Sequence, residues 1–235
     1  QELFSGARDT AESIGEWAFY AAALLIALAL IKRFPYRYFV STHKLIAIAY
    51  LALTVHAVVL LKFSVWAQPL GFAMGLLMAG GVFAALLALA RQIGKRHRVR
   101  GTIESLNYFS EMRVLETSIC LDEGWPGHTG GQFAFVTFAR SESPHPFTIA
   151  SAWNPEERSI MFITKALGDY TQLLPDHLKV GDAAMVEGPY GRFTFDDQRK
   201  RQIWIGGGIG ITPFIARMKQ LASEQHNQDI DLFHT

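Results

Sequence analysis

The stretch Ser143-Pro144-His145-Pro146-Phe147-Thr148-Ile149-Ala150-Ser151 separates two dissimilar parts of this 235-residue chain. Apolar segments with histidines precede it, and a glycine-rich run follows it. Pro144 and Pro146 bias the residues before them toward extended backbone, which predicts a strand entered from a turn. Such a strand offers backbone hydrogen-bond partners, an imidazole, an aromatic face and two hydroxyls, which suit a flat heteroaromatic ring. An ordinary edge strand fits the local pattern equally well.

Composition limits the function classes. The length leaves room for more than one domain. The formal net charge of +1 gives no global sign of a nucleic-acid partner. The single cysteine, Cys120, excludes an intramolecular disulfide and a cysteine-ligated metal cluster, and is most simply a small buried apolar residue. Charged residues make up only 18% because the long apolar segments in the first third of the chain contain none.

Three apolar segments lie in that first third, from Trp17 to Ile31, from Leu45 to Leu61 and from about Pro69 to Ala90. With their flanks, each reaches roughly the 17–25 residues that span a bilayer. Glycines in the third segment allow close helix approach in lipid. We therefore predict three membrane spans, about residues 16–33, 41–62 and 69–91. Residues 1–16 are polar and predict an exposed leader without a cleavable signal.

Basic residues orient these spans. They gather between the first and second spans and after the third, whereas only Lys62 lies between the second and third. The positive-inside rule then places the amino terminus outside and everything after Arg91 in the cytoplasm. The clustered residues are Lys32, Arg33, Arg37 and Lys44, then Arg91, Lys95, Arg96, Arg98 and Arg100.

Two histidines lie in the second span, His43 near its cytoplasmic end and His56 deep within it. An intramembrane imidazole is costly, which favours a functional role. Their separation of 56 − 43 = 13 residues corresponds to roughly 20 Å of rise, suiting two stacked metal centres. It also turns the helix by about 220° beyond whole turns, so the rings do not share one face. Alternatively, His56 bonds a neighbouring helix and His43 lies in the interface.

From Val99 the pattern becomes alternating, which predicts strands over 99–109, 111–120, 132–138, 145–153 and 159–165 in a small antiparallel barrel. Lys165 to Thr171 then opens a helix that ends near Leu178. Gly168 and the Thr171 hydroxyl at its start suit an anion, although simple capping by Asp169 or Thr171 is the alternative. Gly188 and Pro189, within Val186 to Phe193, form a turn.

The last part of the chain has a strand–turn–helix pattern. A buried strand is predicted at 202–205, a helix at 214–221 and a further strand from 229 to 233. In this context a glycine turn lets backbone amides approach a pyrophosphate, although a turn without a nucleotide is possible. The turn residues are Gly206, Gly207, Gly208, Gly210, Thr212 and Pro213.

Four motifs in order resemble the NADPH oxidase and ferric reductase family, and most closely its bacterial predicted ferric reductases. They are residues 36–56, the stretch 143–153, the helix start at 165–171 and the glycine turn at 206–213, with 186–193 similar to the family's strand at the barrel exit. The resemblance implies that His43 and His56 each supply one axial ligand to a b-type haem, with further ligands from upstream helices. It also implies FAD and NAD(P)H contacts at His145, Pro146, Phe147, Thr148, Ser151, Gly168, Thr171, Gly188, Pro189 and the glycine-turn residues.

We therefore expect a multi-domain membrane protein. Transmembrane α-helices form a haem domain over residues 1–98. An antiparallel β-barrel FAD domain follows over 99–196, and residues 197–235 begin a truncated α/β nucleotide-binding domain. The chain is expected to be a fragment of a longer protein in a bacterial inner membrane, with the FAD and NAD(P) domains in the cytoplasm.

The expected function is electron transfer from NAD(P)H through FAD and haem b to an acceptor across the membrane, such as ferric iron or oxygen. Nicotinamide supplies a hydride, whereas haem accepts single electrons. A flavin is therefore required between them. The expected partners are membrane lipid and a small-molecule or protein acceptor, with no nucleic acid. One alternative is a membrane-anchored flavin reductase without haem. The other is a non-catalytic FAD-binding redox sensor.

Overall fold

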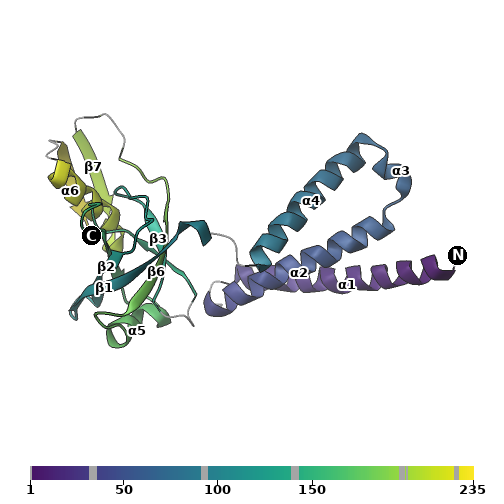
Figure 1. Cartoon of the computed structure of the whole chain (residues 1–235), viewed down its shortest axis with the longest axis horizontal. Helices are drawn as coiled ribbons and strands as arrows, with labels where there is room; N and C mark the ends of the chain where they lie inside the picture. The colour runs from purple at the N-terminus through teal and green to yellow at the C-terminus, as the bar shows by residue number, and fades with distance from the viewer. Residues whose placement is uncertain are drawn as a thin grey trace. The chain divides into compact units, whose positions relative to one another are not determined.

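The computed structural model describes residues 2–31, 36–90, 95–138, 143–195, 199, 201–224 and 228–235. They form two compact units, Gln1–Ile93 and Gly94–Thr235, which are described separately (Figure 1). The predicted boundary at residues 196–197 stays a prediction, because Asp196 and Asp197 lie outside the described residues.

The first unit is helical. Its elements are α1 (Glu2–Leu30), α2 (Tyr36–Leu60), the short α3 (Phe63–Trp66) and α4 (Pro69–Leu89). The leader predicted for residues 1–16 is helical, since α1 already begins at Glu2, and most of its side chains from Arg8 to Glu16 are exposed. Good helix formers such as Ala, Glu and Arg occupy this stretch, and its small residues pack against α2.

Small residues mediate the contact between α1 and α2. Ala11, Gly15 and Ala18 are buried and lie at helical spacing on α1, and Ala49 is buried on α2. A Cβ atom on Gly15 would collide with the ring of His56. The two backbones therefore approach closely, as small residues allow in lipid-embedded helices.

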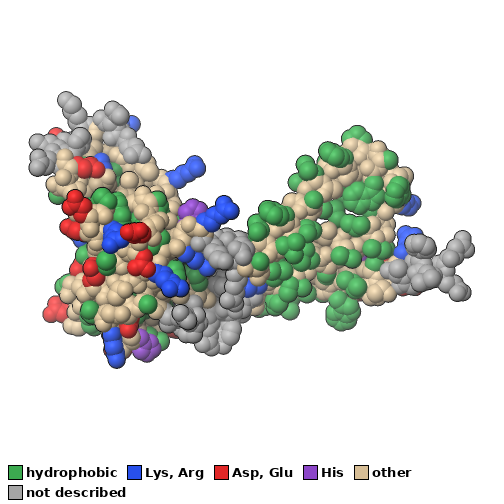
Figure 2. All heavy atoms as spheres, viewed as in Figure 1, with side chains coloured by type: hydrophobic (Ala, Val, Ile, Leu, Met, Phe, Trp, Pro, Cys, Tyr) green, Lys and Arg blue, Asp and Glu red, His purple; other side chains and the backbone are tan. Residues whose placement is uncertain are grey.

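Large apolar side chains of this unit point outward. Trp17, Phe72 and Leu77 are 74%, 74% and 75% exposed, and Figure 2 shows hydrophobic side chains across the helices. By length and composition, two segments could cross a membrane, Arg8–Leu30 and Pro69–Leu89, whereas the described apolar part of α2, Lys44–Leu60, is shorter. Three spans therefore remain a prediction. Lys32, Arg33 and Arg91, three of the basic residues that carry the orientation argument, lie outside the described residues.

The second unit contains the predicted antiparallel sheet. The strands are β1 (Arg98–Phe109), β2 (Val114–Leu121), β3 (Phe133–Thr137), β4 (His145–Thr148), β5 (Ser159–Lys165) and β6 (Ala183–Tyr190), preceded by the 3-10 turn η1 (Lys95–His97). Their order is β4-β3-β6-β1-β2-β5, and a bridge between Ile149 and Phe162 joins the two ends. The sheet therefore curls toward closure, as expected for a small barrel.

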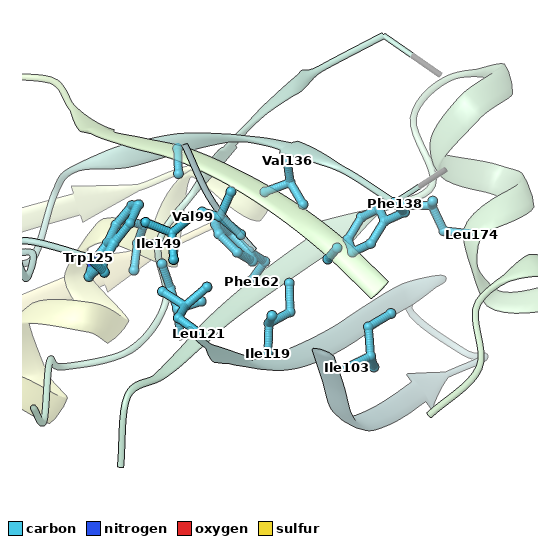
Figure 3. Close-up of a cluster of buried hydrophobic side chains, with 14 of the residues drawn as sticks. Val99, Ile103, Ile119, Leu121, Trp125, Val136, Phe138, Ile149, Phe162 and Leu174 are labelled. Carbon is cyan, nitrogen blue, oxygen red and sulfur yellow. The ribbon is translucent and has the colours of Figure 1, made fainter. Parts of the chain in front are cut away.

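Alternation along each strand builds the barrel core. In β2 and β5 every second residue is buried, because successive side chains point to opposite faces. Ile103, Ile119, Val136, Ile149 and Phe162 are 0–1% exposed. Figure 3 shows Phe162 among side chains from several strands. Helix α5 (Asp169–His177) covers part of this core with Leu174.

A parallel strand pair completes the second unit. β7 (Arg201–Gly206) leads through the turn η2 (Gly208–Ile211) into α6 (Thr212–Glu224), and β8 (Asp229–His234) returns parallel to β7. The buried strand predicted at 202–205 is wrong in part. Trp204 stacks on Phe214 of α6 at 5.3 Å, but Ile203 and Ile205 are 66% and 73% exposed. Only one face of β7 is covered, by α6, in the described part of the chain.

Candidate functional site

Strand β4 is the end strand of the sheet. It pairs with β3 through Phe133↔Thr148 and Val136↔His145. Past β4 the chain turns into the bridge between Ile149 and Phe162. Among the described residues, no strand pairs with the outer side of His145–Thr148, and contact of a flat ring with this strand stays a prediction.

The side chains of β4 divide between two faces. The His145 ring stacks on Tyr170 of α5 at 3.7 Å and 9° between planes. Phe147 lies on the same face and packs partly against the barrel core. Pro146 and Thr148 lie on the opposite face, where Pro146 is exposed and Thr148 is half-buried. A flat ligand can therefore contact Pro146 and Thr148 without disturbing the core.

Ser151 has fixed partners inside the protein. Its Oγ accepts the backbone N–H of Met161 at 3.1 Å and lies 3.2 Å from Nε2 of His128. His128 Nε2 also lies 3.1 Å from the Ser151 carbonyl oxygen, and Trp125 Nε1 donates to His128 Nδ1 at 3.2 Å. Burial lowers the pKa of His128 from its ordinary 6.5 to about 4, although the hydrogen bond with the Ser151 backbone acts in the opposite sense.

Sequence reasoning missed this role of His128. The signal was present as a tryptophan three residues before a histidine in a glycine-rich loop. However, the partner Ser151 lies 23 positions further along the chain. Local spacing cannot reveal such a pair, because the barrel fold brings its members together.

The start of α5 is open. Gly168 is its N-cap residue, and a Cβ atom there would meet nothing within 4 Å. The Thr171 hydroxyl accepts the backbone N–H groups of Leu167 and Gly168 at 3.0 and 3.2 Å. Thr171 therefore caps the helix, while the space beside Gly168 is free for an anion at the helix amino terminus.

Gly188 and Pro189 lie within β6, near its end, so the turn predicted at these two residues is wrong. A Cβ atom on Gly188 would lie 3.3 Å from the Cβ of Ala134, so the two backbones approach closely. Next to them, Glu187 pairs with Nε of Arg98 at 2.6 Å and accepts the Tyr190 hydroxyl at 3.0 Å. Burial, followed by the Glu187 carboxylate, raises the pKa of Tyr190. The tyrosine is therefore a neutral donor at physiological pH.

The glycine turn divides into a packed half and an open half. A Cβ on Gly206 would lie 3.1 Å from Cα of Ile211, whereas Gly208 and Gly210 have nothing within 4 Å of such an atom. Gly208 has φ +50°, a conformation that glycine adopts at little cost. Gly207 lies between them, with the Thr235 hydroxyl 3.8 Å from the position of a Cβ.

Thr212 and Pro213 open α6. The Thr212 hydroxyl donates to the carbonyl of Ile209 at 2.7 Å, and the residue is only 2% exposed. Its hydroxyl thus holds the turn in shape. The open face of the turn, beside Gly208 and Gly210, is the part that a phosphate can approach.

A loop of the barrel packs directly on α6. The backbone N–H of Gly130 donates to Oε1 of Gln220 at 3.1 Å, and a Cβ on Gly130 would lie 2.8 Å from the backbone nitrogen of Arg217. Lys219 Nζ lies 3.1 Å from Sδ of Met161 on β5. The strand that holds the Ser151 hydroxyl and the helix after the glycine turn are therefore neighbours within one unit.

In the helical unit, His56 contacts α1. Its Nδ1–H donates to the carbonyl of Ala11 at 2.7 Å. The side chain of His43 lies outside the described residues, although its backbone is part of α2. Among the described residues there is no group of three or more His, Cys, Asp or Glu side chains that could hold a metal ion.

The barrel geometry agrees with comparisons to known proteins. Residues 110–194 match the family described as FAD-binding domain. The chain is 38% identical over 92 residues to "Ferric reduction oxidase 4" of Arabidopsis thaliana, covering 37% of this chain and 13% of that protein. Residues 110–194 of this chain are thus similar to FAD-binding domains, and part of the chain is similar to a ferric reduction oxidase.

Similarity extends to more distant proteins. The "Carnitine monooxygenase reductase subunit" of Escherichia coli is 28% identical over 110 residues, covering 45% of this chain and 33% of that protein. The structure of the Amycolatopsis cytochrome P450 reductase GcoB matches 58% of this chain and 42% of its own with 21% identity and a TM-score of 0.50. That likeness shows a shared fold. In each case the matched segment is less than half of the relative's length.

Proposed function

We propose that this protein is a ferric reductase-like membrane oxidoreductase that passes electrons from NAD(P)H through FAD and b-type haem to an acceptor across the membrane. The proposed acceptor is ferric iron or oxygen. The FAD-binding family match over residues 110–194 supports the flavin part. The remaining parts rest on this chain's own residues.

The barrel residues fit an FAD. The outer side of β4 leaves backbone groups for the ring, Ser151 adds a hydroxyl, and the space beside Gly168 lies at a helix amino terminus that favours phosphate. Bound FAD would accept a hydride and release single electrons. The roles of the protein are to orient the ring on β4 and to neutralise the phosphate charge.

The proposal depends most on the contact between the barrel, which would hold FAD, and α6, the helix that follows the glycine turn. Gly130 bonds Gln220, and Lys219 approaches Met161, so the barrel and α6 form one packed body. Hydride transfer requires the two rings to touch in a fixed geometry. The glycine turn beside the barrel, with an open face at Gly208 and Gly210, supports a nicotinamide nucleotide site there.

The haem part rests on His56. Because Nδ1 donates its proton to the Ala11 carbonyl, Nε2 is the ring nitrogen that would bind a metal. A ligating histidine commonly donates its other ring N–H to a backbone carbonyl in this way. His56 would therefore hold a haem iron through Nε2, and His43 is proposed as the ligand at the other depth.

A second candidate is a membrane-anchored flavin reductase without haem. The bond from His56 to Ala11 and its packing on Gly15 also account for this histidine as a helix-packing residue. In that case the helices only anchor the flavin unit to the bilayer.

An anaerobic optical spectrum of the full chain in detergent, recorded before and after NADPH, tests both candidates. Flavin bleaching together with a reduced b-type haem band supports the flavocytochrome. Flavin bleaching without a haem band supports the anchored reductase. A chain that binds FAD but is not bleached by NADPH or NADH contradicts both.

A further inference from the structure

His128 is held in one protonation state and one tautomer. An indole N–H can only donate, so Nδ1 of His128 accepts from Trp125. The Ser151 carbonyl can only accept, so Nε2 carries the ring proton. The side chain is 8% exposed, and burial disfavours a second ring proton. Both ring nitrogens of His128 are therefore engaged within the barrel.

This arrangement determines what the Ser151 hydroxyl can do. A serine hydroxyl has one hydrogen and two acceptor positions. The N–H of Met161 occupies one position, and Nε2–H of His128 lies 3.2 Å from the same oxygen. Because both neighbours are donors, the hydroxyl hydrogen of Ser151 must point away from them. Ser151 is half-buried, so this hydrogen can reach a ligand.

We propose that His128 is a positioning residue that makes Ser151 an obligate hydrogen-bond donor to bound FAD. The inference rests on the proposed function, because it takes Ser151 as part of the FAD site. The acceptor is a ring nitrogen or an oxygen of FAD, since Ser151 follows β4 by only three residues. Trp125 is the residue that sets the tautomer, and it acts only through His128.

A purely packing role for His128 is the competing explanation. Its ring lies 6.2 Å from that of Trp125 and 5.4 Å from that of Trp153, so it also fills space in the loop. A packing role needs the volume of the ring but neither of its nitrogens. Substitutions that keep one property and remove the other separate the two roles.

The test measures the dissociation constant of FAD for the full chain in detergent, by quenching of flavin fluorescence. Ser151→Ala removes the donor and His128→Phe keeps ring volume without hydrogen bonds, and each should weaken FAD binding about tenfold. His128→Asn has one donor and one acceptor and should recover most of the affinity. The double variant that combines His128→Phe with Ser151→Ala should bind FAD no more weakly than Ser151→Ala alone.

Thr117→Val is the matched control. Thr117 is fully buried in the same barrel, and its hydroxyl has no hydrogen-bond partner among the described residues. This variant should keep the FAD affinity of the unaltered chain. A general disturbance of the barrel would lower it as well.

Several results would overturn the inference. They are an unchanged FAD affinity in Ser151→Ala, an unchanged affinity in His128→Phe, or losses that add in the double variant. An increase in KM for NADPH with unchanged FAD affinity also contradicts it. If His128→Phe does not fold, Ser151→Ala and His128→Asn still decide the outcome. An unaltered chain that fails to bind FAD would refute the proposed function itself, which is a different result.

Discussion

The two units of this protein bury opposite kinds of side chain. In the barrel, Phe162, Ile119 and Val136 are fully buried and alternate with outward residues. In the helical unit, the buried residues are small, such as Ala11 and Gly15. Water drives large apolar groups inward, whereas hydrocarbon does not, so helices in lipid pack through small residues. The contrast supports the proposal that the two units work in different solvents.

The histidines repeat this contrast. His128 of the barrel uses both ring nitrogens within the protein. For His56 of the helical unit, only the bond from Nδ1 to Ala11 is found among the described residues. The His128 ring thus bonds its neighbours through both nitrogens, whereas the His56 ring has a second nitrogen that can bind a ligand.

Truncating a large side chain should give the largest difference between the units. Phe162→Ala leaves a cavity in the barrel and should lower the free energy of unfolding by about 3–5 kcal/mol. Phe72→Ala in α4 removes an outward ring and should change it by about 0.5 kcal/mol or less. Denaturation of the full chain in detergent, followed by FAD release and by circular dichroism, measures both. Equal losses in the free energy of unfolding of the two variants would contradict the contrast between the two units.

Acid should destabilise the barrel through His128. The unfolded chain protonates this residue at its ordinary pKa of 6.5 but the folded chain only near 4, so between these values the unfolded state binds more protons. The free energy of unfolding should therefore fall by about 1.4 kcal/mol per pH unit as pH drops through this window, about 3 kcal/mol in all. Above pH 6.5 this contribution is constant.

The control for this pH dependence is His128→Asn, which has no titrating ring. Urea denaturation at a series of pH values should show a shallower slope in this variant. Identical slopes in the two proteins would contradict the assignment to His128.

Two glycines of the helical unit should respond differently to the same change. Gly15→Ala would collide with the ring of His56 and should cost about 1–3 kcal/mol through overpacking. Gly80→Ala meets nothing within 4 Å and should be neutral or slightly stabilising. Thermal unfolding in detergent, with the haem absorbance as a second measurement, compares them. A tolerated alanine at Gly15 would indicate that α1 and α2 do not pack closely.

The smallest effects should come from the two open glycines of the second unit. Alanine at Gly210 or Gly168 has room, so stability should not change. A methyl group at either position would still displace a bound phosphate. Gly210→Ala should therefore raise KM for NADPH by about tenfold or less. Gly168→Ala should raise the dissociation constant of FAD by about tenfold or less. Each variant is the control for the other. Loss of both cofactors in either variant would mean that the sites are not separate.

Much of the fold could be predicted from the sequence because the local periodicity of apolar and polar residues determines the elements. Alternation predicted β1, β2, β3 and β5 within a few residues, and the strand–turn–helix pattern predicted β7, η2 and α6. The burial of Ala11 and Gly15 within the leader was missed, because composition alone does not reveal that they have a helix to pack against. The exposure of Ile203 and Ile205 was missed because it depends on which faces of β7 the chain covers.

The candidate site divides in the same way. The residues of β4 and the open glycines could be named from the sequence, since proline, glycine and hydroxyl side chains act through the local backbone. The capping role of Thr171 was already an alternative, and the buried turn role of Thr212 became visible only with its neighbours. The pairing of Trp125, His128 and Ser151 could not be predicted, because no periodicity links these positions.

By itself, the sequence determined the order of the elements, the apolar helices at the start, the flavin-type strand and the glycine turn. These follow from short-range rules of backbone preference and side-chain period. Tertiary structure decided which groups meet: His56 with Ala11, His145 with Tyr170, and His128 with Ser151. Hydrogen bonding and burial act through distance in space, and the folded chain alone sets that distance.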